Sequence, residues 1–216
     1  MARRYLKHIL LFFLVTSVIV GAAEGYKEAD YERLDDICSG SCWTVSKVRE
    51  KKTGKIYALK TFVSGPKGYE HAEKEISALE QLDHESIVKM RTSNIENRQR
   101  DDPVHIALEY LPCDLDAALS HPEIRENKKE ILYQVLSGVA HIHSKKLAHG
   151  DIKPANILID PTTMTVKICD FGFCCKGEEE LPFPGTPTGG YYSDILSVAG
   201  LMVRLYLGES SLKKKN

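Results

Sequence analysis

At 216 residues the chain has room for one ordinary domain or two small lobes, and its 43% hydrophobic content is normal for a folded globular protein. The 29 Lys plus Arg nearly balance the 30 Asp plus Glu, so no basic field points to nucleic acid, and we expect no nucleic-acid partner. The six cysteines match neither paired Cys-x-x-Cys zinc ligands nor a dense disulfide scaffold, which favours free thiols.

The N-terminal segment has the layout of a secretory signal peptide. Arg3, Arg4 and Lys7 precede an apolar run at 9–20, and small residues follow it. The run is shorter than the roughly 20 residues that a membrane-spanning helix prefers. We therefore expect a signal peptide over residues 1–23, with an uncleaved signal anchor or a buried N-terminal extension as the alternatives. The chain is accordingly expected in the secretory pathway or secreted, or else anchored to a membrane.

After a linker at 24–30, the pattern changes to short β-type runs. The expected strands cover residues 42–48, 55–62, 87–90 and 104–110. A Lys-Lys-Thr-Gly turn at 51–54 joins the first two strands into a hairpin. A helix is predicted over 69–82, because apolar residues recur there at helical spacing. These residues are Ala72, Ile76, Leu79 and Leu82.

The second half of the chain is mainly helical. An amphipathic helix is expected over 127–144, and a last apolar helix over 194–207. Between them, residues 155–159 and 165–169 read as two short strands joined by an Asp-Pro turn. The whole pattern predicts the α+β class.

Two motifs in this half contain catalytic residue types. The stretch His-Gly-Asp-Ile-Lys-Pro-Ala-Asn ends at Asn156, and Asp-Phe-Gly begins at Asp170. Either motif alone is more often a surface turn. Together, in this order and with room between them for two short strands, they resemble the catalytic loop and the metal-binding motif of protein kinases.

The resemblance implies a role for each of these residues. Asp151 would orient the substrate hydroxyl, while Asn156 and Asp170 would hold the Mg²⁺ that bridges the ATP phosphates. Lys153 resembles the lysine that serine/threonine kinases place near the transferred phosphate. That acceptor class is therefore favoured over tyrosine.

An upstream lysine and a helical glutamate complete the phosphate-holding groups. Lys60 ends an alternating strand pattern and resembles the kinase lysine that contacts the α- and β-phosphates. Glu75 is the best candidate for its partner, because the neighbouring apolar face aims this side of the helix toward the sheet.

A glycine-rich loop is expected over residues 37–45, although only one of the family's glycines is present. Ile37, Gly40 and Val45 align with it, whereas Cys38 and Trp43 stand where glycines are usual. Glycine there allows close backbone approach to phosphate, so nucleotide is expected to bind more weakly or in an altered pose.

The segment between the two halves resembles the kinase hinge. The backbone at Glu109 and Leu111 would bond to adenine, and Asp114 is placed to reach the ribose. Without the flanking motifs, this stretch would read as an ordinary strand running into a turn.

The resemblance implies a two-lobed protein-kinase-like fold over 31–216, with a β-rich N-lobe at 31–110 and a helical C-lobe at 111–216. Gly150 replaces the usual arginine, so control by an activation-loop phosphate is not expected. The segment at 185–187 resembles the late activation segment, but an Ala-Pro-Glu counterpart is missing. The C-lobe is therefore expected to be incomplete, and its exposed apolar surface favours either marginal stability or a partner that covers it.

The function expected from these features is serine/threonine-protein kinase activity with ATP, Mg²⁺ and a protein substrate. The alternative is a pseudokinase or a nucleotide-binding interaction module without turnover. A decayed, poorly folding product is a third reading.

Overall fold

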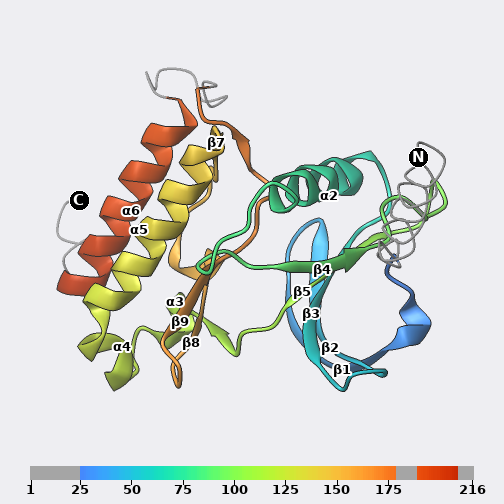
Figure 1. Cartoon of the computed structure of the whole chain (residues 1–216), viewed down its shortest axis with the longest axis horizontal. Helices are drawn as coiled ribbons and strands as arrows, with labels where there is room; N and C mark the ends of the chain where they lie inside the picture. The colour runs from blue at the N-terminus through green and yellow to red at the C-terminus, as the bar shows by residue number, and fades with distance from the viewer. Residues whose placement is uncertain (1–24, 179–188, 209–216) are drawn as a thin grey trace, which may run out of the picture.

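The computed structural model describes residues 25–178 and 189–208. The expected signal segment at 1–23 and the stretch at 185–187 lie outside these ranges. Figure 1 shows two lobes, one built on a β-sheet and the other dominated by two long helices. This arrangement confirms the predicted two-lobed α+β fold.

The N-lobe is a five-stranded antiparallel sheet in the order β1-β2-β3-β5-β4. Its strands are β1 (Tyr31–Ser39), β2 (Trp43–Glu50), β3 (Ile56–Phe62), β4 (Met90–Ser93) and β5 (Val104–Glu109). Helix α2 (Pro66–Leu79) packs against β3 and β5 through a buried apolar face. The four apolar positions predicted for this face are all buried. The helix starts and ends three residues earlier than the sequence pattern predicts, because Pro66 occupies its first turn and favours initiation there.

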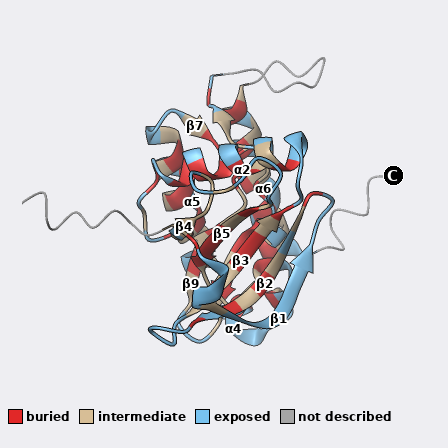
Figure 2. Ribbon diagram, turned by 90° about the vertical axis from the view of Figure 1, so that its right-hand side faces the viewer, coloured by how far each residue is buried: buried red, intermediate tan, exposed pale blue. Residues whose placement is uncertain are grey.

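Two strand predictions in this lobe need correction. Strand β1 was not predicted, because it lies at an edge and nearly all its side chains are exposed, so it carries no apolar alternation (Figure 2). The strand expected at 87–90 instead begins at Met90. Val88 donates its N–H to the carbonyl of Ile168 at 2.9 Å, and the N–H of Ile168 donates to Ser86 at 2.8 Å. The apolar run therefore ties the two lobes together rather than extending the sheet.

The C-lobe is built around α5 (Lys128–Ser144) and α6 (Gly190–Leu207), which lie side by side in Figure 1. Its smaller elements are α3 (Leu115–Ala118), α4 (Pro122–Glu126), β6 (Cys113–Asp114), β7 (Leu147–Ala148), η2 (Pro154–Asn156), β8 (Ile157–Asp160), β9 (Thr165–Ile168) and β10 (Cys175–Lys176); η1 (Glu28–Asp30) precedes β1. Helix α6 begins four residues before the predicted start, at Gly190. No helix in the described ranges is long and apolar enough to span a membrane.

A continuous apolar core runs through both lobes. It joins Phe62 and Ile76 of the N-lobe to Val135, Ile168 and Phe171 of the C-lobe. Figure 2 shows the buried residues concentrated between the sheet, α2 and the long helices. The residues that flank the space between the lobes are therefore held on rigid elements.

Candidate active site

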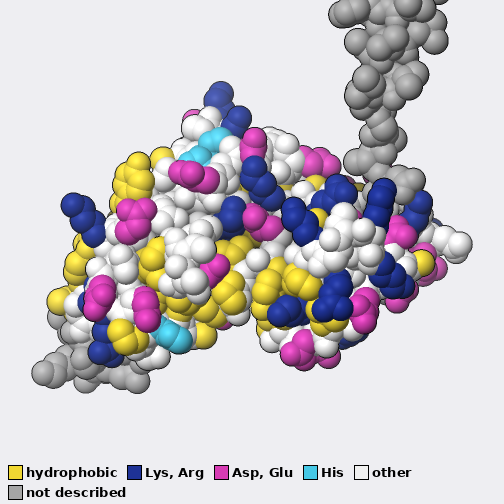
Figure 3. Space-filling view, turned by 60° about the horizontal axis from the view of Figure 1, so that its bottom comes forward, with side chains coloured by type: hydrophobic (Ala, Val, Ile, Leu, Met, Phe, Trp, Pro, Cys, Tyr) yellow, Lys and Arg dark blue, Asp and Glu magenta, His cyan; other side chains and the backbone are white. Residues whose placement is uncertain are grey.

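A cleft of about 340 Å³ separates the sheet from the C-lobe. Most of the predicted binding residues line it: Ile37, Val45, Lys60, Glu75, Glu109, Leu111, Asp114, Asn156 and Asp170. Figure 3 shows hydrophobic side chains on both sides of the hollow between the two lobes. The structure thus brings together residues that are far apart in the sequence.

Lys60 lies at the centre of a buried cluster of charges. Its Nζ donates to Glu75 Oε2 at 2.6 Å and to Asp170 Oδ1 at 2.9 Å. Burial alone would lower the pKa of the Lys60 ammonium, but the two carboxylates outweigh it and raise that pKa above its ordinary value. Lys60 is therefore a fixed cation at the inner end of the cleft.

The Asp170 carboxylate accepts hydrogen bonds from Lys60 and from the backbone of Gly172. Burial raises the pKa of the Asp170 carboxyl, but the charge and hydrogen bond of Lys60 lower it more, so the net pKa lies below its usual value. The backbone of Asp170 has φ of 66°, a left-handed conformation that is uncommon outside glycine but tolerated by aspartate. This turn places the carboxylate over the cleft while Phe171 enters the core.

Residues 149–156, the segment expected to form the catalytic loop, form a second polar cluster. The amide nitrogen of Asn156 donates to the backbone oxygen of Asp151 at 2.8 Å and to its Oδ2 at 2.9 Å. Lys153 Nζ donates to the same carboxylate oxygen at 2.6 Å. The amide oxygen of Asn156 is thereby left for a cation. Asp151 and Lys153 do not line the cleft themselves, but Asn156, which does, holds the Asp151 carboxylate in place.

The chemistry of these donors fits Mg²⁺. Within the described ranges, no cluster of three or more His, Cys, Asp and Glu side chains could hold a metal ion. Mg²⁺ is commonly held by one or two protein oxygen ligands together with the phosphates of a nucleotide. The Asp170 carboxylate and the Asn156 amide oxygen supply such a pair.

Helix α6 holds the first residues of the loop at 149–156 by hydrogen bonds. Asp194, which is 1% exposed, accepts the backbone N–H groups of His149 and Gly150 at 2.8 and 2.9 Å. His149 Nε2 in turn bonds to the carbonyl oxygen of Cys169 at 2.9 Å, and its ring packs on Phe171. Helix α6 therefore holds the backbone of residues 149 and 150 through direct contacts.

Residues 37–45, expected to form a glycine-rich loop over the phosphates, are arranged differently from that expectation. Gly40 does not line the cleft; it lies against the indole of Trp43, which does. A Cβ at Gly40 would lie 2.7 Å from Trp43 Cε2. Ile37 and Val45 face the cleft from the flanking strands.

The hinge residues have partners of their own. The Glu109 carboxylate accepts the N–H of Lys89 at 2.7 Å and pairs with Lys167 Nζ at 2.9 Å. Asp114 Oδ1 caps α3 by accepting the N–H of Ala117 at 2.8 Å. Asp114 therefore lines the cleft and at the same time caps α3.

Several cleft residues were not predicted as part of the site. They include Cys38, Ala58, Val88, Leu108, Cys113, Leu158 and Cys169. Strand alternation offers a signal for Ala58, because it shares a face of β3 with Lys60. All six cysteines of the chain lie in the described ranges and are free thiols, as predicted.

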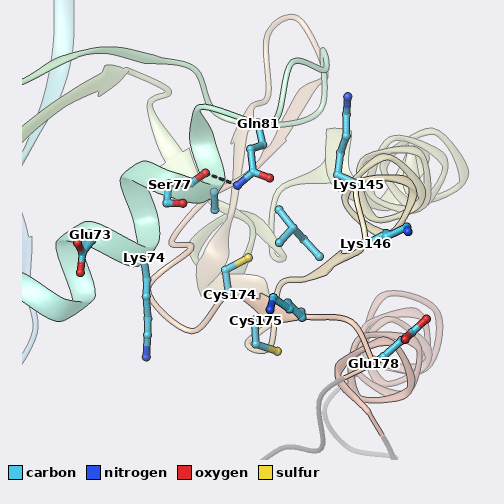
Figure 4. A pocket seen from close by; sticks show the side chains of 12 residues that line it. Glu73, Lys74, Ser77, Gln81, Lys145, Lys146, Cys174, Cys175 and Glu178 are labelled. Atoms are coloured by element: carbon cyan, nitrogen blue, oxygen red, sulfur yellow. Dashed lines mark hydrogen bonds between the residues drawn. The ribbon is translucent and has the colours of Figure 1, made fainter.

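Another, larger hollow of about 720 Å³ is lined by the second half of α2 and by residues near 145–147 and 174–178 (Figure 4). Figure 4 shows side chains of α2 on one side, Lys145 and Lys146 on the other, and Cys174 and Cys175 between them. None of the predicted catalytic or binding residues lines it. The chemistry of the site therefore belongs to the smaller, more apolar cleft.

Comparison with known proteins agrees with this geometry. The family model for the protein kinase domain matches residues 31–205. The serine/threonine-protein kinase bur1 of Neurospora crassa is 30% identical over 181 residues, which cover 79% of this chain and 32% of that relative. The chain therefore spans about a third of the length of this curated relative. Since the family model spans most of the chain, from β1 to α6, this protein belongs to the protein kinase family.

Proposed function

We propose that this chain is a serine/threonine-protein kinase that transfers the γ-phosphate of ATP to a protein hydroxyl. The observation that carries the proposal is the contact of Lys60 with both Glu75 and Asp170, at 2.6 and 2.9 Å, beside an apolar cleft. Phosphoryl transfer depends mainly on positioning and on electrostatic stabilisation, which such a fixed arrangement supplies.

One end of the cleft would bind adenine, and the other would bind the phosphates. Val45, Ala58 and Leu158 offer apolar surfaces for adenine, and the backbone at Glu109 and Leu111 is the proposed hydrogen-bonding edge. Lys60 would hold phosphate oxygens at the inner end. Mg²⁺, held by Asp170 and Asn156 with the phosphates, would neutralise charge on the transferred group.

Asp151 is the proposed residue that accepts and aligns the substrate hydroxyl. Its carboxylate is bonded to Asn156 and Lys153, so it is oriented before a substrate arrives. Lys153, which is bonded to that carboxylate, would lie near the transferred phosphate, as the resemblance to serine/threonine kinases implies. The similarity to a serine/threonine-protein kinase supports the same class.

The test is a phosphotransfer assay with ATP, Mg²⁺ and a generic protein acceptor, comparing the wild type with Asp151→Asn. Loss of a positioned general base typically lowers turnover by about 10² to 10⁴-fold. Asp116→Asn is the matched control, because this surface aspartate pairs with Arg204 outside the cleft. Equal turnover in the wild type and Asp151→Asn would overturn the proposed catalysis.

A nucleotide-binding module without turnover is the second candidate. Trp43 favours it, because the indole lies against Lys60, with 5.0 Å from Nζ to the ring centroid, at the end of the cleft meant for phosphates. Thermal unfolding with ATP, in the presence and absence of Mg²⁺, separates the candidates. A rise in melting temperature without phosphotransfer supports the module, and robust phosphotransfer excludes it.

We also propose that a partner covers the outer face of α6, which lies at the edge of the molecule in Figure 1. This face exposes the side chains of Tyr192, Ile195, Leu196, Met202, Tyr206 and Leu207, at 45–61%. Contiguous apolar patches of this kind commonly mark protein interfaces. Sedimentation analysis of the chain alone and with candidate protein substrates tests this idea; a monomer in every mixture contradicts it.

Entry into the secretory pathway remains a proposal that rests on the basic and apolar pattern of residues 1–23. Expression in a eukaryotic host followed by N-terminal sequencing is the test. A mature start near Glu24 supports cleavage, and an intact Met1 excludes it.

A further inference from the structure

Trp43 is placed beside the one cation in the cleft that would hold phosphate. Lys60 Nζ lies 5.0 Å from the centroid of the Trp43 ring and 5.1 Å from that of Phe62. An ammonium has three N–H donors, and two of them are directed at Glu75 and Asp170. The remaining side of the Lys60 ammonium is therefore covered by aromatic rings.

The chain holds this indole in place through the turn between β1 and β2. Gly40 donates its N–H to the Trp43 carbonyl at 2.8 Å, which closes the turn. The indole packs on the Cα side of Gly40, where a Cβ would lie 2.7 and 2.9 Å from Trp43 Cε2 and Cζ2. Any larger residue at this position would have to displace the ring, so Gly40 makes room for the indole rather than leaving space for a phosphate.

The side of β2 that Trp43 occupies faces the nucleotide. Val45 of β2 pairs with Lys60 of β3, and Trp43 pairs with Phe62, so Trp43, Val45 and Lys60 share one face of the sheet. Both Trp43 and Val45 line the cleft. Since Val45 lies toward the adenine end, Trp43 lies toward the end where phosphates would meet Lys60.

We propose that Trp43 is a specificity-determining residue whose indole occupies the phosphate side of the cleft and must move off Lys60 before a nucleoside triphosphate can bind. The inference rests on the proposed nucleotide-binding function. A nucleoside without phosphates fits the apolar part of the cleft and leaves the indole in place. ATP must instead replace the contact between the Lys60 cation and the indole with charge-assisted hydrogen bonds. The cleft consequently favours ATP over adenosine less than it would with glycine at position 43.

The experiment measures dissociation constants for Mg²⁺-ATP and adenosine by calorimetry in the wild type, Trp43→Gly and Trp43→Phe. Removing the ring is expected to tighten ATP binding roughly tenfold, the size of a partly desolvated cation–π contact. Adenosine affinity should change by no more than about twofold. Trp43→Phe keeps an aromatic face, so its ATP affinity should lie between those of the wild type and the glycine variant.

Intrinsic fluorescence provides a second readout, because Trp43 is the only tryptophan in the chain. ATP should change the emission of the wild type, since the indole leaves Lys60, whereas adenosine should leave it nearly unchanged. Adenosine binding by Trp43→Gly also shows that this variant is folded.

Each outcome is decisive. ATP affinity equal in the wild type and Trp43→Gly, with adenosine still bound by both, overturns the role of Trp43 and leaves the nucleotide site standing. Failure of all three proteins to bind either compound overturns the nucleotide-binding function itself, and the inference with it. Tighter ATP binding by Trp43→Gly together with an ATP-specific emission change supports the proposal.

Discussion

The carboxylate of Asp194 in α6 accepts the backbone N–H of His149 at 2.8 Å, and its other oxygen accepts the N–H of Gly150 at 2.9 Å. These bonds link the last long helix directly to the catalytic loop. The same carboxylate is 2.9 Å from His143 Nε2 of α5. Three segments therefore meet at one buried side chain.

We expect Asp194→Ala to destabilise the protein by about 2 to 4 kcal/mol, because two buried N–H groups lose their acceptor. Asp194→Asn should cost less, since its amide oxygen still accepts one of them. Urea unfolding provides the measurement. Asp116→Ala is the control, as this carboxylate is 47% exposed beside Arg204 and its loss should cost less than about 1 kcal/mol. Similar losses for the two alanine variants would contradict the anchoring role.

The sequence predicts the family because ordered motifs identify it. Lys60, Asn156 and Asp170 each belong to a motif with fixed spacing, and all three line one cleft. The pose of Trp43 could not be predicted, since it depends on its packing against Gly40 and on a lysine from another strand. Strand β1 escaped prediction for a related reason: an exposed edge strand shows little apolar periodicity.

The buried pair of Lys60 and Glu75 should show strong energetic coupling. Their side chains are 5% and 0% exposed, so Lys60→Met leaves a carboxylate buried without its partner and should cost about 3 to 5 kcal/mol. Glu75→Gln combined with Lys60→Met should cost less than the sum of the single changes. A double-mutant cycle by denaturant unfolding measures the difference.

The exposed pair of Glu70 and Lys74 on the same helix is the control for that cycle. These side chains are 64% and 49% exposed, so their coupling should be no more than about 0.5 kcal/mol. If the buried pair shows coupling as weak as this, the Lys60 contact does not stabilise the fold.

His149 should make stability depend on pH. Burial lowers its pKa from the ordinary value of 6.5 more strongly than its Cys169 hydrogen bond and neighbouring aspartates raise it. As the pH falls below 6.5, the unfolded chain takes up a proton at this residue before the folded protein does, so folding stability decreases. His149→Gln should reduce this decrease in urea unfolding between pH 6.5 and 5.

Measurements on the same variant above pH 7.5 are the control. Above pH 7.5 the imidazole is neutral in both states, so the slope of stability against pH should be equal in the wild type and His149→Gln. Burial also lowers the pKa of His105, so a residual slope of the same sign is expected in the variant. An unchanged slope below pH 6.5 would contradict the lowered pKa of His149, because the residue would then take up a proton equally readily in both states.

Two features of position 150 favour glycine: a positive φ and the close approach of a neighbouring backbone. Its φ is 80°, and a Cβ there would lie 2.7 Å from the carbonyl oxygen of Phe173. Gly54 has a similar φ of 74° with nothing within 4 Å of a Cβ, so Gly54→Ala isolates the backbone cost of roughly 1 to 2 kcal/mol. Gly150→Ala should cost at least about 1 kcal/mol more in urea unfolding, because the segment after Asp170 must shift. Equal losses would mean that Phe173 moves without cost and that packing adds nothing to the requirement for glycine.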